Sequence, residues 1–233
     1  MFSKYLPKIA ICCAVKVFFG YLMISDLGLV IAEEVASVGK LRSSADMAFS
    51  QGSIDEAIKL WEQVIAIEPN NDSNFYKRFR VYLRQKKYKE ALADLSKALL
   101  INSKHENALV QRAKLQTKLG KCAEAVQDFQ SLQVLNPENK ELKLLSSAQM
   151  CANAIQGMDM AYGKKNYAQA KIFATDALGH AENSVHIYLR RAWCHYFTGD
   201  LYESIADTGK VLKVESNHME ALELRGRAYY VLG

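Results

Sequence analysis

The sequence predicts an all-α protein, a right-handed superhelix (α-solenoid) of about five and a half helix-turn-helix repeats. Three observations support this fold class. Apolar residues recur at helical spacing along a chain of 233 residues that contains only three prolines and twelve glycines. Similar blocks of sequence follow one another at a fixed period, and each complete block carries a small residue at the same place.

An internal repeat sets the order of the elements. Five units share one frame and a sixth starts it again, beginning near Val38, Asp72, Glu106, Cys151, Val185 and Met219. Four of the five intervals are 34 residues, which is the period of tetratricopeptide repeats. Each complete unit is therefore expected to form two helices, and the sixth unit contributes its first helix.

Fixed positions within the unit support this frame. The twentieth position is always small, at Ala57, Ala91, Ala125, Ala170 and Ser204. A small side chain there lets the second helix cross close to the first. The twenty-fourth position holds residues expected to pack between helix pairs, namely Trp61, Leu95, Phe129, Ala174 and Thr208. Capping-box spacing predicts that Ser53 and Asp200 cap the second helices of their units.

One interval departs from the 34-residue period. Eleven extra residues, KELKLLSSAQM at positions 140–150, separate the third and fourth units. Eleven residues make about three helical turns, so we predict an extension of a long helix that joins two subdomains. The alternative is a surface loop, which the apolar stripe from Leu142 to Ala148 disfavours. The subdomains are then residues 33–139, with repeats 1–3, and residues 151–233, with repeats 4–5 and the first helix of repeat 6.

The N-terminus is typical of a signal peptide. Lys4 and Lys8 precede an apolar run, and small or branched residues end at Ala32, where we predict cleavage of residues 1–32. The alternative is an uncleaved anchor over residues 9–31. Lys16 and Asp26 would then lie within the membrane at a cost of about 2.5–3.5 kcal/mol each. Cleavage would leave a chain with no stable membrane insertion, and either outcome directs it to the secretory pathway.

Three cysteines and one glycosylation sequon remain after residue 32. Cys122, Cys151 and Cys194 lie at spacings of no metal or redox motif, so we predict free thiols. Asn71 begins an Asn-Asp-Ser sequon and is a candidate glycan acceptor.

The composition and motifs indicate neither nucleic-acid binding nor catalysis. The net charge of +5 is mixed along the sequence and gives no reason to expect a nucleic-acid partner. The sequence contains no nucleophile beside a base, no metal-binding spacing and no glycine-rich phosphate loop. We therefore expect no catalytic residues, no metal site, no cofactor and no enzyme activity.

Stacked repeats instead form a concave face suited to holding another polypeptide. The frame predicts which first-helix positions face it, and the candidate client-binding residues are Phe49, Tyr76, Arg80, Leu83, Val110 and Lys114. Ordinary packing against neighbouring helices is the alternative for each apolar member. A cytosolic carboxylate clamp is rejected, because Asp46 stands where such clamps place a neutral amide.

Two stretches carry a family resemblance. They are ALADLSKALLINSKHENALVQRAKLQTKLGKCAEAVQDF (91–129) and SIADTGKVLKVESNHMEALELRGRAYY (204–230). The chain resembles the lumenal DnaJ co-chaperones of subfamily C, the homologues of the cellular inhibitor of the interferon-induced kinase. The second stretch is especially similar to the plant branch.

The resemblance implies a role as an endoplasmic-reticulum co-chaperone. In that family the repeats bind unfolded or misfolded clients, and a C-terminal J domain with a His-Pro-Asp motif recruits the lumenal chaperone BiP. This sequence contains no His-Pro-Asp motif, so we expect an N-terminal fragment that could hold clients in the lumen without driving BiP. In the full-length family, client transfer to BiP would support the unfolded-protein response, and a kinase is a further possible partner. A generic repeat scaffold in the secretory pathway is the alternative, and an enzyme with an unrecognised site is a third.

The last helix carries a further expectation. Residues 219–233 have only the preceding repeat to pack against, so we expect them to fray with Leu224, Tyr229 and Val231 uncovered.

Overall fold

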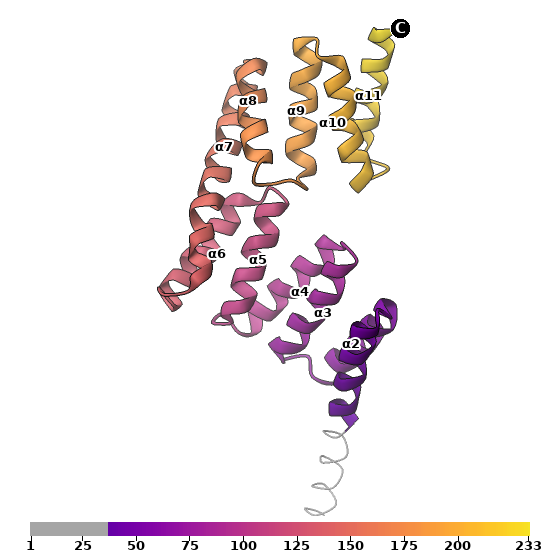
Figure 1. Ribbon diagram of the computed structural model, residues 1–233, viewed down its shortest axis with the longest axis vertical. Coiled ribbons are helices and arrows are strands. Elements are labelled where there is room, and N and C mark those ends of the chain that lie inside the picture. Colours follow the sequence, from indigo (N-terminus) through magenta and orange to yellow (C-terminus); the bar gives the residue numbers. More distant parts are fainter. Residues whose placement is uncertain (1–36) are drawn as a thin grey trace, which may run out of the picture. The chain divides into compact units, whose positions relative to one another are not determined.

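The computed structural model describes residues 37–233, and all of its regular secondary structure is helical (Figure 1). The signal peptide predicted over residues 1–32 lies outside the described residues. The chain divides into two compact units, one ending at Gln85 and one covering Lys86–Gly233.

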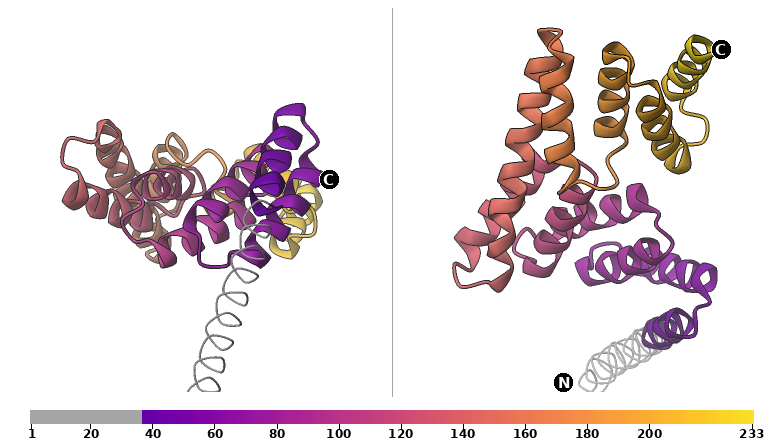
Figure 2. Two further views of the ribbon diagram at one scale, coloured as in Figure 1. Left: turned by 90° about the horizontal axis from the view of Figure 1, so that it is seen from below. Right: turned by 45° about the horizontal axis from the view of Figure 1, so that its top comes forward.

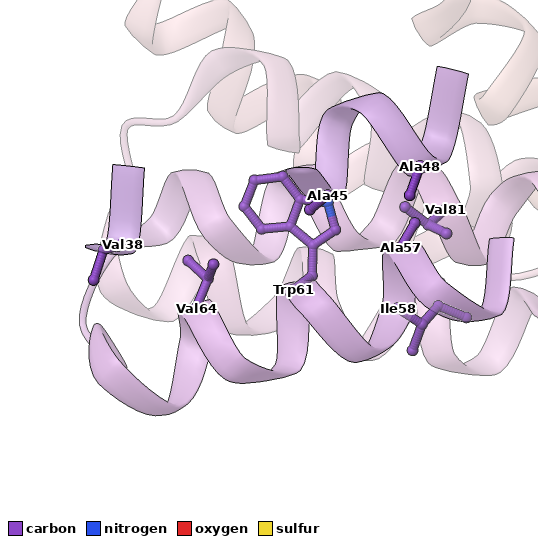
Figure 3. Close-up of a cluster of buried hydrophobic side chains, with 8 residues drawn as sticks. All are labelled: Val38, Ala45, Ala48, Ala57, Ile58, Trp61, Val64 and Val81. Carbon is purple, nitrogen blue, oxygen red and sulfur yellow. The ribbon is translucent and has the colours of Figure 1, made fainter. Parts of the chain in front are cut away.

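The first unit contains three described helices. They are a helix over residues 37–51, α2 (Ile54–Ile67) and α3 (Asp72–Arg84). Their apolar faces meet in one cluster around the indole of Trp61, shown in Figure 3. The cluster consists of Val38, Ala45, Ala48, Ala57, Ile58, Trp61, Val64 and Val81. Residues at three- and four-residue spacing in α2 therefore supply the core of this unit.

The second unit continues the helical pairs. Its elements are α4 (Tyr88–Ile101), α5 (Glu106–Lys118), α6 (Cys122–Leu135), η1 (Lys140–Leu144), α7 (Leu145–Gly163), α8 (Tyr167–Leu178), α9 (Val185–Thr198), α10 (Leu201–Val214) and α11 (Met219–Leu232). Helices adjacent in sequence pack against each other, as α7 and α8 show (Figure 1 and Figure 2). The segment at 140–150 comprises the 3-10 helix η1 and the start of α7.

The packing positions of the repeat frame are confirmed. The five small residues at the twentieth position are all fully buried, as are the residues at the twenty-fourth position from Trp61 to Thr208. Small residues allow close helix crossing within a pair, and the larger ones fill the space next to it.

Salt bridges between the two helices of a repeat were not predicted from the sequence. Arg112 on α5 forms a two-pronged salt bridge with Asp128 on α6, at 2.7 Å for each contact. Arg191 on α9 does the same with Asp207 on α10, at 2.7 and 2.8 Å. In both pairs the partners are 16 residues apart and link the two helices of one repeat.

The fourth repeat replaces this ion pair with an apolar contact. At the equivalent places stand Gly157 on α7 and Phe173 on α8. A Cβ added at Gly157 would lie 2.9 Å from a ring carbon of Phe173. The glycine therefore makes room for the ring, and the same site accepts either a salt bridge or an aromatic side chain.

The cysteines correct the sequence prediction. Cys122 at the start of α6 and Cys151 in α7 form a disulfide, with their Cα atoms 5.8 Å apart. Both are buried, in a cluster that also contains Met158 and Ile187. Packing of α6 against α7 brings together two residues that are 29 positions apart in the chain. Cys194 is a free, buried thiol, as predicted, and burial raises its pKa to about 11.

The predicted side-chain caps are also corrected. Neither Ser53 nor Asp200 makes a side-chain capping hydrogen bond to its helix. The Asp200 carboxylate instead pairs with Lys171 and accepts a hydrogen bond from the Thr198 hydroxyl at 2.7 Å. The hydrogen bond from Lys171, with that from Thr198, lowers the pKa of Asp200 to about 2. A nearby cation therefore competes successfully with the backbone for this carboxylate.

The final helix is better covered than expected. Leu224 is fully buried in a cluster with Leu189, Ala192 and Val211, so its predicted exposure is wrong. α11 packs against α10 and also touches α9, and this contact covers one face. Tyr229 and Val231 lie on the exposed part of the helix, as predicted.

A tight turn separates the two helices of a repeat and needs a left-handed residue. Gly120 (φ +79°) and Gly199 (φ +84°) occupy this place between α5 and α6 and between α9 and α10. A Cβ at Gly120 would lie 2.2 Å from the hydroxyl oxygen of Ser184, whereas nothing lies within 4 Å of one at Gly199. Glycine at position 120 is therefore required both by the backbone conformation and by the nearby Ser184. Glycine at position 199 is required by the backbone conformation alone.

Alanine substitution should separate these two constraints. Gly199→Ala is expected to lower the free energy of unfolding by about 1 kcal/mol, the cost of a left-handed alanine. Gly120→Ala adds a steric overlap and should lower it by about 2–4 kcal/mol. Urea denaturation of the two variants measures the difference. Equal losses would contradict the close approach of Ser184 to Gly120.

Candidate peptide-binding surface

Part of the predicted client-binding surface lies together in the first unit. We define the Phe49 surface as Phe49, Tyr76, Arg80, Leu83 and Arg84. The last four residues lie at i, i+4, i+7 and i+8 along α3, so they share one face of that helix. Phe49 comes from the last turn of the helix over residues 37–51.

Two arginines hold the ring of Phe49. The guanidinium carbon of Arg80 lies 5.6 Å from the ring centroid, and that of Arg84 lies 5.4 Å from it. A nitrogen of Arg84 also donates to the carbonyl oxygen of Phe49 at 3.5 Å. These cation–π contacts orient the half-buried ring, whose other side packs against the core of the unit.

Tyr76 and Leu83 extend the apolar part of this surface. The Tyr76 ring centroid lies 4.8 Å from that of Phe79, which is buried. Burial raises the pKa of Tyr76, against an opposing effect of Arg80, so its hydroxyl stays protonated at neutral pH. Leu83 is 36% exposed. The surface therefore combines aromatic and aliphatic groups with two cations.

Arg42, Asp46 and Lys77 stand at the carboxylate-clamp positions of the first unit, and each forms an ion pair within the chain. Lys77 donates to the Asp46 carboxylate at 3.0 Å. Arg42 pairs with Glu68, whose carboxylate also accepts from Asn74 at 3.1 Å. The cations that a carboxylate clamp would use are thus already paired with acidic side chains.

Two of the predicted contact residues do not join this surface. Val110 in α5 is only 5% exposed, so its prediction as a client contact is corrected. Its side chain is therefore among the buried residues of α5. Lys114, also on α5, forms an ion pair with Glu141 of η1 at 2.7 Å. Its ammonium is therefore engaged within the chain.

Arg84 is the surface residue that the sequence frame missed. The frame selected positions two, five, nine and twelve of each first helix, and Arg84 stands at the thirteenth position of its unit. The detectable signal is its spacing of four residues from Arg80 on the same helix. Its proximity to Phe49 depends on how two helices pack, which the sequence spacing does not show.

Asn71 has a structural role that bears on glycosylation. Its side-chain oxygen accepts from the backbone amide of Ser73 at 3.1 Å and caps α3. Its side-chain nitrogen, the atom that would carry a glycan, donates to Glu68 at 2.9 Å. Glycosylation at Asn71 stays a prediction, and it would replace that hydrogen bond.

The part of the chain that the structure describes contains no group of three or more His, Cys, Asp or Glu side chains that could hold a metal ion. Within residues 37–233, no helix combines the length and apolar content that crossing a membrane requires.

Comparison with known proteins supports the repeat frame. A family model described as anaphase-promoting complex, cyclosome, subunit 3 matches residues 50–131. The crystal structure of the P58(IPK) TPR domain superimposes with a TM-score of 0.74 at 26% sequence identity. The match covers 84% of this chain and 56% of that one.

Two curated relatives are similar over most of the chain. DnaJ homolog subfamily C member 3 of Homo sapiens is 28% identical over 203 residues, which is 85% of this chain and 40% of the relative. The tetratricopeptide repeat and J domain-containing co-chaperone DNJ1 of Fusarium oxysporum f. sp. lycopersici is 26% identical over 197 residues, covering 84% and 37%. The chain thus spans about two fifths of the length of these relatives. The fold is that of tetratricopeptide repeats, and the chain is similar in sequence to DnaJ homolog subfamily C member 3.

Proposed function

We propose that this chain holds unfolded or misfolded polypeptides through the Phe49 surface, as the repeat region of a co-chaperone. The observation that carries the proposal is the composition of this surface. Phe49, Tyr76 and Leu83 present apolar area, and Arg80 and Arg84 lie beside it. Unfolded chains expose apolar side chains and backbone carbonyls, and this surface can contact both. The co-chaperone name of the fungal relative supports the same reading.

The proposed location is the lumen of the endoplasmic reticulum. The basic and apolar N-terminus and the Cys122–Cys151 disulfide support it. Disulfides persist in oxidising compartments and are rare in the cytosol, where thiols are kept reduced. The sequence-predicted signal peptide and the disulfide are independent of each other, and both favour the secretory pathway.

The later steps of the proposed function belong to a longer protein. The name of the fungal relative includes a J domain, and the human relative belongs to the DnaJ group. We propose that a J domain in such a protein passes clients from the repeats to a BiP-type chaperone and so supports the unfolded-protein response. Restraint of a kinase would be a further role of the longer protein.

Serine substitution tests client holding. The variant Phe49→Ser/Tyr76→Ser/Leu83→Ser is expected to lose most suppression of aggregation of a chemically unfolded protein, measured by light scattering without ATP. Each of these side chains contributes at most about 1.5–3 kcal/mol when a client buries it. The loss of three contacts should therefore abolish holding at protein concentrations where the unmodified chain is effective.

The control for this variant is Ile67→Ser. Ile67 ends α2 in the same unit and is 41% exposed, close to the exposure of Leu83. It should keep full suppression. Circular dichroism must show unchanged helical content in both proteins, because Phe49 also packs against the core. A folded triple variant that still suppresses aggregation would exclude the Phe49 surface as the client site.

A further inference from the structure

A basic pocket lies in the second unit, and none of its lining residues belongs to the Phe49 surface. Four segments form it: the turn before α4, the first residue of α4, the loop and first turn at the start of α9, and the last turns of α10. We define the Lys86 pocket by its main polar residues, which are Lys86, Tyr88, Asn183, Tyr188, Lys210 and Lys213. Its volume is about 450 Å³, within the range of pockets that bind ligands.

The pocket carries an excess of positive charge. Lys86, Lys210 and Lys213 have no ion-pair partner within residues 37–233. The acidic residue in the wall, Glu182, pairs with Lys118 at 2.7 Å. The hydrogen bond from Lys118 lowers the pKa of Glu182, so its charge is already balanced. Three ammonium groups from two separate segments therefore share one cavity without an internal counter-charge.

The backbone at Lys86 is strained. Lys86 has a left-handed conformation (φ +59°) at the turn position where Gly52, Gly120 and Gly199 stand in other repeats. A lysine costs about 1–2 kcal/mol more than glycine in this conformation. Lys165 has the same conformation (φ +58°) in the turn between α7 and α8, but it does not line the pocket. The chain thus offers a strained lysine inside the pocket and a matched one outside it.

The remaining wall is cross-linked by hydrogen bonds and is partly apolar. Asn183 donates from its side chain to the Tyr88 hydroxyl at 3.4 Å and from its backbone amide to the carbonyl of Lys118 at 3.0 Å. The rings of Tyr88 and Tyr188 lie in the wall with Val214. A ligand can therefore place an apolar group against the rings while its anionic group faces the lysines.

The pocket shares part of its lining with a wider groove of mixed charge. This groove has a volume of about 740 Å³ and shares Lys86, Tyr88 and Val214 with the pocket. It also contains Glu90 and Glu220 together with Lys87 and Lys121, and Lys89 is paired there with Glu215 at 2.9 Å. The carboxylates interrupt the positive charge of the groove and so disfavour a uniformly anionic polymer along its whole length. A peptide with a few acidic residues is not disfavoured in this way, because it needs positive charge only where those residues lie.

We propose that the Lys86 pocket binds an acidic segment of a partner polypeptide. Carboxylates of the segment pair with Lys86, Lys210 and Lys213, and an apolar neighbour packs against Tyr88 and Tyr188. This site is separate from client holding, which relies on apolar contacts at the Phe49 surface. It would give the chain a charge-dependent partner in addition to unfolded clients.

Matched glycine variants of the full chain test the proposal. The probe is a short fluorescein-labelled peptide that alternates glutamate with leucine, followed by fluorescence anisotropy at physiological salt. Lys86→Gly should weaken binding about threefold, and Lys86→Gly/Lys210→Gln/Lys213→Gln about tenfold or more. Lys165→Gly should leave binding unchanged. Both glycine variants relieve the same backbone strain, so both should raise the urea midpoint.

Three binding results would contradict the proposal for the Lys86 pocket. Equal binding by Lys86→Gly and Lys165→Gly would place the peptide elsewhere and overturn the proposal. Equal affinity for a peptide with glutamine in place of glutamate would show apolar adhesion instead of charge recognition. Binding of polyphosphate at these lysines without binding of the acidic peptide would make the pocket a phosphate site. Lys210→Gln/Lys213→Gln, on exposed positions of α10, repeats the test without touching the strained turn.

Discussion

Removing the disulfide with Cys122→Ala/Cys151→Ala should lower the free energy of unfolding of the second unit by about 3–4 kcal/mol. The bond closes a loop with a sequence separation of 29 and so restricts the unfolded chain. Both sulfur atoms are also buried in an apolar cluster, and the alanines leave part of that space unfilled. Denaturation in urea, with hydrogen exchange to assign the loss to residues 86–233, measures the effect.

Reduction provides an independent measurement. Dithiothreitol should destabilise the unmodified chain by a similar amount and leave the double variant unchanged. Cys194→Ala is the matched control, because Cys194 is buried but free. Its pKa of about 11 keeps it a thiol near neutral pH, so it should not exchange with the disulfide. Non-reducing peptide mapping that links Cys194 to either partner, or no stability change on reduction, would contradict the assigned pair.

Replacing Asp207 with alanine should lower the free energy of unfolding by about 3 kcal/mol. Asp207 is nearly buried, and it holds Arg191 through two hydrogen bonds between α9 and α10. The hydrogen bond from Arg191 to the Asp207 carboxylate raises the pKa of Arg191. In the alanine variant the guanidinium stays charged but has lost this favourable partner. Urea denaturation monitored by circular dichroism provides the measurement.

Two further variants show what kind of contact this site requires. Arg191→Met/Asp207→Leu should recover most of the stability, because the fourth repeat places Gly157 and Phe173 at the same positions. Glu223→Ala breaks the exposed Arg227–Glu223 pair of α11 and should cost about 0.5 kcal/mol or less. A loss at Asp207 no greater than that at Glu223 would mean that the buried pair contributes little. If Arg191→Met/Asp207→Leu does not recover the stability, the charges themselves are needed at this site.

The sequence alone predicted much of the first unit's core but less of the candidate site. Trp61 and Ala57 were placed by the repeat frame, and both are buried where predicted. Phe49 and Arg80 were assigned to a common surface, and they meet there. Arg84 was missed, and Val110 was wrongly included. The missed residue stands one place outside the frame, and the wrongly included one is buried.

The sequence by itself determined the helical repeat and the positions that pack inside it, because these depend on local spacing. Helical periodicity repeats within a few residues, and each small residue such as Ala125 meets a helix next to it in the chain.

Only the tertiary structure decided which distant groups meet. The Cys122–Cys151 bond requires a particular packing of α6 against α7, and the Lys86 pocket requires α4, α9 and α10 to approach one another. The pairing of Asp200 with Lys171 in place of its helix cap likewise depends on a neighbouring repeat supplying the cation. Such contacts leave no periodic pattern in the sequence, because they join groups whose separation along the chain is arbitrary.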